Sequence, residues 1–245
     1  MTAAQFRASL VGRACFLGND LADKIDLAAV VAIFPRPLPR ADASAEDSPA
    51  LTCAIDVLPF FWMPEKTLHR RAQEDGVPYP EWARAGYVTT TPGNLIDHEA
   101  IAEFQIGPLS KEFKIRGIGI DQAGAAGVVS KLRRHFGDDL VDEVPQGFRS
   151  LSEASKLVEA LILTGNLTHD GNPCMSWCVG NMGKEENAWH EIRPVKTSQR
   201  KRIDGGVALV DGVWKMTKTP MVQRSIYNTR RDASGQLVGV RTLGS

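Results

Sequence analysis

The stretch Ile115-Arg-Gly-Ile-Gly-Ile-Asp121 is an apolar run that ends on an aspartate. Its two glycines indicate that a neighbouring element approaches the backbone of this segment closely. The pattern that follows predicts a helix at about 123–135, a strand at 140–144 and a helix at about 152–163. Alternating strands and helices are typical of an α/β layer with parallel strand pairing. Residues 115–121 are therefore expected to begin the parallel half of a sheet.

Three further strands are predicted on the N-terminal side. Apolar runs at 15–18 and 26–34 flank a short polar turn, and a third run at 51–58 follows a proline-rich loop at 35–49. Because parallel pairing needs a crossover connection, consecutive strands of this kind favour antiparallel pairing. The expected fold class is α/β, with a central mixed β-sheet of three antiparallel strands followed by parallel strands, flanked by helices.

The remaining segments are predicted to be mainly helical. Helices are expected at 64–76, at 78–86, from 94 or 97 to about 107, at 172–182 and at 203–210, with a turn at 89–93. Residues 1–13 are expected to be a lead-in, and residues 214–245 a poorly patterned C-terminal tail in which 237–242 has the pattern of an edge strand. No repeat or clear boundary divides the sequence, so a single domain is expected over residues 1–245.

Composition narrows the class of protein. The 245 residues carry 29 basic and 29 acidic side chains, which argues against holding nucleic acid by bulk charge alone. No apolar run approaches the roughly 20 residues that span a bilayer, and the N-terminus lacks the order of a signal peptide. Four scattered cysteines do not form a disulfide framework. We therefore expect a soluble protein with reduced thiols and no membrane contact.

Three aspartates stand at the ends of distinctive segments. Asp20 and Asp121 close apolar runs, and Asp204 precedes a predicted helix. A carboxylate at the end of a buried strand is costly without a positive partner, and three converging carboxylates suit hard divalent cations. That arrangement would indicate metal-dependent phosphodiester chemistry. Taken singly, the same residues also fit structural roles, Asp20 in a hairpin turn and the other two as helix caps.

A series of short motifs carries a resemblance to a known family. Gly18-Asn-Asp-Leu-Ala-Asp-Lys-Ile-Asp-Leu-Ala-Ala-Val resembles a Gly-hydrophobic-Asp-Leu element followed by Asp-Leu-x-Ala. Further matches follow in the same order: Trp62-Met-Pro-Glu65, Tyr79 with Trp82 and Gly86, Thr91-Pro-Gly-Asn94 with Ile96-Asp97, Gln146-Gly147, Leu167-Thr-His-Asp-Gly-Asn-Pro173, Trp177 with Asn181, Lys196, and Arg202-Ile-Asp204. Collinear over roughly residues 10–212, the set resembles the nuclease domain of tailed-bacteriophage terminase large subunits, which has an RNase H-like fold.

The resemblance implies an endonuclease that cuts concatemeric viral double-stranded DNA during genome packaging, with little sequence specificity and two Mg²⁺ or Mn²⁺ ions. Asp20 would bridge the ions, while Asp121 and Asp204 would each complete the ligands of one. Asp26 is a further candidate ligand. The basic residues Lys196, Arg200 and Arg202 would contact the DNA backbone.

The sequence departs from the family pattern at two places. Asn19 occupies a position that is usually apolar, and Gly205-Gly206 with Asp211-Gly212 interrupts a segment that is normally a cleaner helix. Glycine costs about 1 kcal/mol relative to alanine in a helix interior, so the length of that helix and the pose of Asp204 are in question.

The family also implies partners. These are double-stranded DNA, the terminase ATPase domain, the small terminase subunit and the portal protein, in the cytoplasm of the bacterial host. The sequence contains no Gly-x-x-x-x-Gly-Lys-Ser/Thr phosphate loop, so this chain is not expected to hydrolyse ATP. Two alternatives stay open: a DNA-clamp or portal-docking module with latent cleavage, and another RNase H-like nuclease such as a resolvase.

Overall fold

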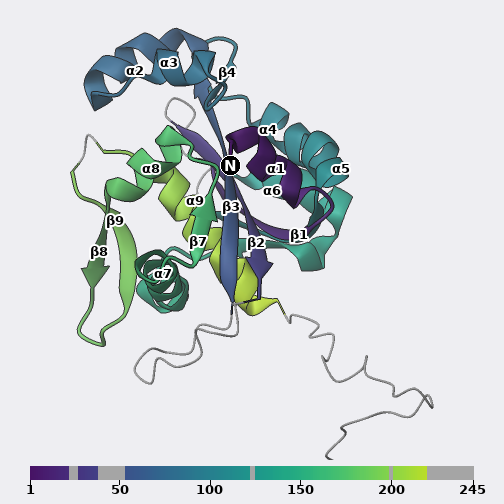
Figure 1. The fold of residues 1–245 in the computed structure, drawn as a ribbon, viewed down its shortest axis with the longest axis vertical. Coiled ribbons are helices and arrows are strands. Elements are labelled where there is room, and N and C mark those ends of the chain that lie inside the picture. Colours follow the sequence, from purple (N-terminus) through teal and green to yellow (C-terminus); the bar gives the residue numbers. More distant parts are fainter. Residues whose placement is uncertain (22–26, 38–52, 122–124, 199–200, 220–245) are drawn as a thin grey trace, which may run out of the picture.

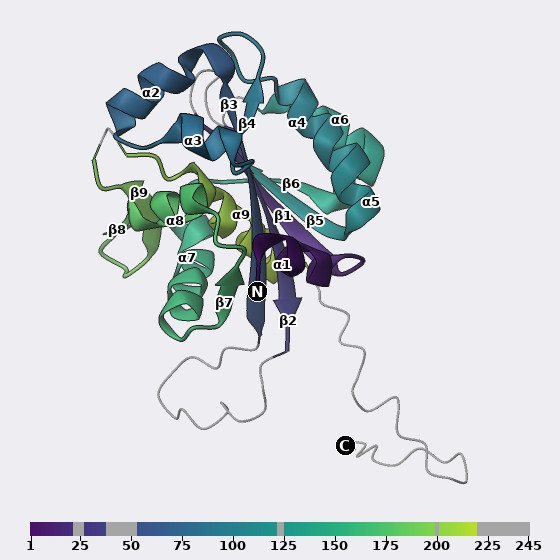
Figure 2. The ribbon, with the colours of Figure 1, turned by 45° about the horizontal axis from the view of Figure 1, so that its top comes forward.

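A mixed β-sheet lies at the centre of the molecule, with helices on both faces (Figures 1 and 2). The computed structural model describes residues 1–21, 27–37, 53–121, 125–198 and 201–219. Within those ranges the sheet has seven strands in the order β4-β3-β2-β1-β5-β6, and β7 pairs with β3 away from this path.

The strand order follows the predicted division into two halves. Strands β1 (Ala14–Asp20), β2 (Ala28–Arg36) and β3 (Ala54–Pro64) pair antiparallel in sequence order. Strand β5 (Lys114–Asp121) pairs parallel with β1, and β6 (Val141–Val144) pairs parallel with β5. The expected α/β, RNase H-like fold class with a mixed central sheet is confirmed.

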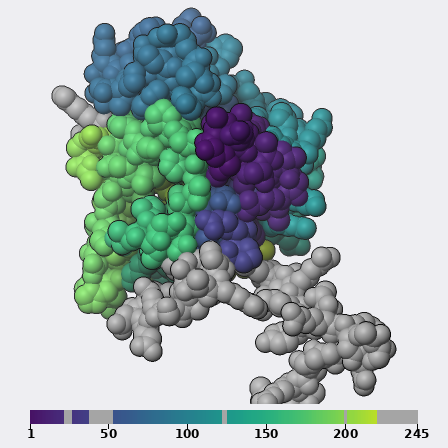
Figure 3. Space-filling model, viewed as in Figure 1, coloured from purple at the N-terminus to yellow at the C-terminus, as the bar shows by residue number. Residues whose placement is uncertain are grey.

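Two helical layers enclose the sheet. The first contains α7 (Phe148–Leu163), α8 (Pro173–Gly180) and α9 (Asp204–Lys218), and the second contains α1 (Ala3–Leu10), α4 (His98–Phe104) and α6 (Ala126–Phe136). Each layer has its own buried apolar cluster against the sheet. The other helical segments are η2 (Glu65–Thr67), α2 (Leu68–Asp75), α3 (Tyr79–Arg84), the π-helix η3 (Gln105–Leu109), α5 (Ser110–Glu112) and η4 (Asp138–Leu140). In the space-filling view, α2 and α3 form the top of the molecule (Figure 3).

Several short elements were not predicted. The segment expected as a turn at 89–93 contains β4 (Thr89–Thr91), which pairs parallel with β3. Strand β7 (Leu167–His169) also pairs with β3, and β8 (Met182–Glu186) forms a separate hairpin with β9 (Ile192–Lys196). The lead-in holds α1, which begins with a capping box between Thr2 and Gln5. The edge strand expected at 237–242 lies outside the described residues.

The prediction for the last helix was wrong in length. Helix α9 runs without a break from Asp204 to Lys218, so residues 214–218 belong to it and not to a tail. Gly212 of this helix is needed for contact with the sheet: a Cβ on Gly212 would lie 2.2 Å from Ile33 Cδ1 and 2.8 Å from the backbone nitrogen of Gly18. A Cβ on Gly18 would lie 1.7 Å from the carbonyl oxygen of Ala208. The glycines therefore allow the helix backbone to rest directly on β1 and its neighbours.

In the part of the chain that the structure describes, no helix is both long enough and apolar enough to cross a membrane.

Candidate active site

Two of the three predicted aspartates end neighbouring parallel strands. Asp20 is the last residue of β1 and Asp121 the last of β5, and both side chains are half-buried. The β1–β5 register pairs Asn19 with Ile120, which brings the two strands to the same edge of the sheet. Because side chains alternate along a strand, Asp20 shares its face with Gly18, and Asp121 shares its face with Gly119. Both glycines contact α9, so both aspartates face the layer that contains α9.

The direction of α9 brings the third aspartate to the same edge. A Cβ on Gly117 would meet Lys215, whereas one on Gly119 would meet Asp211, 2.5 Å from its carbonyl oxygen. From Gly117 to Gly119 the strand advances about 6.6 Å towards its C-terminal end. The residues of α9 that they contact, Lys215 and then Asp211, step back about 6 Å towards the start of the helix. Helix and strand run antiparallel, and the first residue of α9 is Asp204, 5% exposed.

The three aspartates share an edge without forming a closed ligand set. Among the described residues, no three histidine, cysteine or acidic side chains lie close enough together to hold one metal ion. Asp26, the fourth candidate ligand, lies outside the described residues. The donor chemistry suits a hard cation, since carboxylate oxygens are the ligands that Mg²⁺ and Mn²⁺ prefer.

The structure reveals a further acid, which was not predicted as a site residue. Asp211 is fully buried, and it accepts hydrogen bonds from Gln146 Nε2 at 3.2 Å to Oδ1 and 3.4 Å to Oδ2. Burial raises the pKa of Asp211 well above its usual value; the hydrogen bond from Gln146 opposes this rise, and the charge of Asp121 adds to it. The seven-residue spacing from Asp204, two helical turns, was the available signal. In the sequence, however, Asp211-Gly212 suggested only an interrupted helix.

The start of α9 is fixed by close contacts on several sides. A Cβ on Gly205 would lie 2.8 Å from the Phe61 ring, and one on Gly206 would lie 2.8 Å from Met182 Sδ. Asn181 Nδ2 donates to the carbonyl oxygen of Arg202 at 3.1 Å, just before the helix. The two glycines therefore seat the helix terminus against its surroundings, which holds Asp204 at the sheet edge.

A family model matches most of the chain. The model described as "Terminase large subunit, endonuclease domain" matches residues 5–219. The chain belongs to this family. The resemblance seen in the motifs is thereby confirmed.

Individual relatives agree with the family. The chain is 31% identical over 222 residues to Protein YmfN of Escherichia coli (strain K12), a match that covers 82% of this chain and 43% of that protein. It is 29% identical over 210 residues to the terminase large subunit of Enterobacteria phage HK97, covering 82% of this chain and 37% of that protein. The crystal structure of the HK97 bacteriophage large terminase superposes with a TM-score of 0.68 at 27% identity, covering 87% of this chain and 43% of that one. The chain thus spans about two fifths of the length of these curated relatives.

The predicted DNA-contacting residues of this terminase domain lie in different environments. Lys196, the last residue of β9, is exposed. Arg202 is 9% exposed, and its Nε lies 3.2 Å from Asp75 Oδ2, an oxygen that also accepts a 2.9 Å hydrogen bond from the Tyr79 hydroxyl. Its position therefore favours a role in anchoring the segment before α9 over contact with DNA. Arg200 lies outside the described residues.

The polar residue at the usually apolar family position is also accommodated. Asn19 is fully buried on the face of β1 opposite α9, where its Oδ1 accepts a 2.8 Å hydrogen bond from Gln105 Nε2. Gln105 begins the π-helix η3. The two amides thus share one hydrogen bond, whereas Asn19 Nδ2 and Gln105 Oε1 have no hydrogen-bond partner among the described residues.

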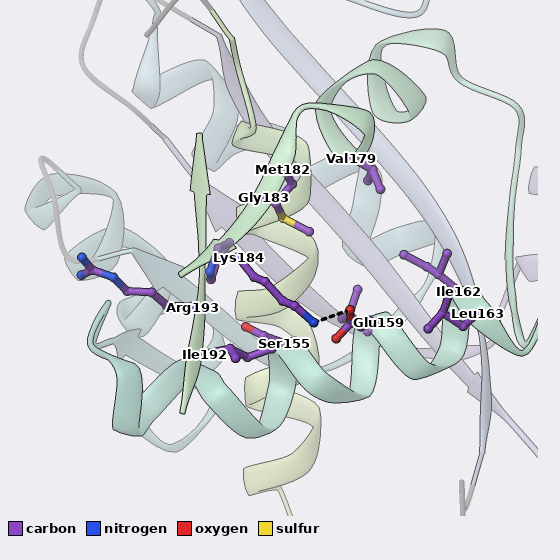
Figure 4. A pocket seen from close by; sticks show the side chains of 12 residues that line it. Ser155, Glu159, Ile162, Leu163, Val179, Met182, Gly183, Lys184, Ile192 and Arg193 are labelled. Atoms are coloured by element: carbon purple, nitrogen blue, oxygen red, sulfur yellow. Dashed lines mark hydrogen bonds and ion pairs between the residues drawn. The ribbon is translucent and has the colours of Figure 1, made fainter. Parts of the chain in front are cut away.

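One groove of the described structure lies away from the aspartates. A cavity of about 350 Å³ opens between α7, the end of α8 and the β8–β9 hairpin, lined by apolar side chains such as Ile162, Val179 and Met182. Figure 4 shows the ion pair between Lys184 and Glu159, 2.8 Å long, at this groove. None of the described aspartates lines it, so the groove is separate from the acidic edge.

Proposed function

We propose that this terminase domain is a metal-dependent endonuclease that cuts concatemeric viral double-stranded DNA during genome packaging. The observation that carries the proposal is the antiparallel seating of α9 on β1 and β5. That seating gathers Asp20, Asp121 and Asp204 at one edge of the sheet. Family membership supports the nuclease activity, and the carboxylate chemistry supports the use of divalent cations.

The proposed role of each side chain is the one that the resemblance to the family implies. Asp20 would hold two Mg²⁺ or Mn²⁺ ions jointly, with Asp121 and Asp204 each holding one, and Asp26 is a further candidate ligand. Such ions activate an attacking water and neutralise the charge that develops on the phosphate. Lys196 and Arg200 would hold the DNA backbone, which positions the duplex without reading its sequence. We propose that Arg202 does not contact DNA and instead anchors the segment that leads to Asp204.

The partners belong to the proposal as well. The terminase ATPase domain, the small terminase subunit and the portal protein would bring DNA to this domain in the cytoplasm of the bacterial host. The chain spans only about two fifths of its curated relatives, so these partners are proposed from the family alone.

Plasmid cleavage with Mg²⁺ or Mn²⁺ tests the proposal. Asp20→Asn, Asp121→Asn and Asp204→Asn should each lower the cleavage rate by about 10²-fold or more, as removal of a group that stabilises a charged transition state does. Asp138→Asn is the matched control, because Asp138 is an exposed acid at the opposite end of β6. Wild-type rates in all three active-site variants would refute the assignment.

A second candidate function is a DNA-clamp or docking module whose cleavage is latent in isolation. The neutral formal net charge of the chain, 29 basic against 29 acidic side chains, favours it, because no excess of positive charge holds DNA for cutting. This alternative predicts DNA binding that persists in EDTA, with no cutting under Mg²⁺ or Mn²⁺. Cutting by the isolated domain would exclude it.

A further inference from the structure

Asp211 is difficult to explain as a contributor to stability. It lies on the sheet-facing side of α9, fully buried, and among the described residues its recorded hydrogen bonds come from the neutral amide of Gln146. A buried carboxylate without a cationic partner destabilises a fold, and an apolar residue of similar volume is often more stabilising. Lys215, one turn further along the same face, is also buried, but it has an ion-pair partner in Asp142.

Asp211 contacts residues that are close neighbours of Asp121 in the sheet. Its backbone carbonyl packs on Gly119, two residues before Asp121 in β5. Gln146, its hydrogen-bond donor, also donates to the carbonyl oxygen of Val144 at 3.1 Å. Val144 is the register partner of Asp121 in the β5–β6 ladder. The side chain of Gln146 thus links the end of β6, which lies beside Asp121, to Asp211 of α9.

The direction of the Asp211 side chain fits the same interpretation. Side chains on a helix tilt towards its N-terminus, and the N-terminus of α9 lies at the edge where β5 ends. The carboxylate of Asp211 is therefore directed towards the level of Asp121. Two nearby carboxylates repel each other in the absence of a cation, and the repulsion is relieved when a cation binds.

We propose that the Gln146–Asp211 pair positions Asp121 for divalent cations, so that the buried carboxylate strengthens cation binding while it lowers the stability of the metal-free fold. Asp211 is a positioning residue in this account, and Asp121 remains the ligand. The inference rests on the proposed function, since it assumes that Asp121 binds a cation.

The test compares Asp211→Leu, Asp211→Asn and Gln146→Leu with the wild type. The half-saturating Mn²⁺ concentration is measured by calorimetric titration and by cleavage rate, and the melting temperature is measured in EDTA. Asp211→Leu should raise the melting temperature and also raise the half-saturating Mn²⁺ concentration about tenfold or more, as loss of an outer partner of a metal ligand does. Asp211→Asn, which keeps the shape of the side chain, should shift the Mn²⁺ requirement in the same direction.

Gln146→Leu separates the two effects. It removes the only donor recorded for Asp211 in the described structure, so the melting temperature should fall while the Mn²⁺ requirement rises. The double variant Gln146→Leu/Asp211→Leu should need no more Mn²⁺ than Asp211→Leu alone, because both changes break the same link. The control Lys215→Met alters a buried charge on the same helix face and should leave the Mn²⁺ requirement unchanged.

An unchanged Mn²⁺ requirement in both Asp211 variants would overturn the inference, even if stability moved. So would a requirement that rises as much in Lys215→Met. If the wild type itself neither binds Mn²⁺ nor cuts DNA, the proposed function fails first, and that outcome is distinguishable because it does not depend on Asp211.

Discussion

The two ends of the central sheet treat buried acids differently. At one end, Asp56 of β3 is 7% exposed and forms ion pairs with Arg13 at 2.7 Å and Arg36 at 3.1 Å. At the other end, Asp211 is fully buried with an amide as its recorded partner, beside the strand that ends in Asp121. The first arrangement neutralises charge within the protein. In the second, an amide takes the place of the arginines, at an edge where we propose that cations bind.

The largest expected effect comes from separating α9 from the sheet. Gly18→Ala would place a Cβ 1.7 Å from the Ala208 carbonyl, so α9 has to move, at a cost of about 3 kcal/mol or more, and cleavage should be lost with Asp204 displaced. Gly127→Ala is the matched control, since nothing lies within 4 Å of its Cβ, and it should change stability by about 1 kcal/mol at most. Chemical denaturation and plasmid cleavage measure both. Equal behaviour of the two variants would show that close contact with α9 is not required.

A substitution at Asp56, the acid that is paired with arginines, should change stability alone. Asp56→Asn leaves two arginines without their carboxylate and should destabilise the fold by about 1–3 kcal/mol, less than for a fully buried pair because each arginine is about a third exposed. The half-saturating Mn²⁺ concentration should not change. A shift in that concentration would mean that the two ends are coupled, and the comparison between them would fail.

Without metal, the contribution of Asp211 to the stability of the fold should depend on pH. The folded state raises the pKa of Asp211 above its ordinary 3.8, so the folded protein holds this proton more tightly than the unfolded chain does. Its contribution to stability is therefore fully present below about pH 3.8 and is lost as the pH rises through the folded-state pKa. Asp211→Asn lacks this loss, so its stability advantage over the wild type should grow with pH across that window. If the melting temperatures of the two proteins in EDTA changed in parallel with pH, the burial argument would be contradicted.

The smallest effect is expected at the exposed DNA contact. Lys196→Ala removes one exposed cation and should weaken DNA binding at all sequences alike, reducing the slope of log affinity against log salt by about 1. Melting temperature and Mn²⁺ requirement should stay at wild-type values. An unchanged salt slope would remove Lys196 from the DNA surface.

The strands and the aspartates at their ends could be predicted from the sequence, but the way in which α9 packs on the strands could not. Apolar runs made β1, β2, β3 and β5 predictable, whereas β4 and β7, three residues each, depend on pairing with β3 and show no periodicity of their own. The glycines of α9 suggested breaks in the helix because the groups they fit against are distant in sequence, Gly18 for Gly212 and Phe61 for Gly205. For the same reason Asp211 was missed, and Arg202 was assigned to DNA although Asp75 of α2 engages it.

The central claim is that α9 gathers Asp20, Asp121 and Asp204 at one sheet edge to bind divalent cations. The most direct measurement is a crystal structure of the domain soaked in Mn²⁺, with anomalous scattering to locate the ions. The account predicts two manganese peaks among these three aspartates, with Asp20 in contact with both. Well-ordered crystals in saturating Mn²⁺ without a peak at this edge would contradict it.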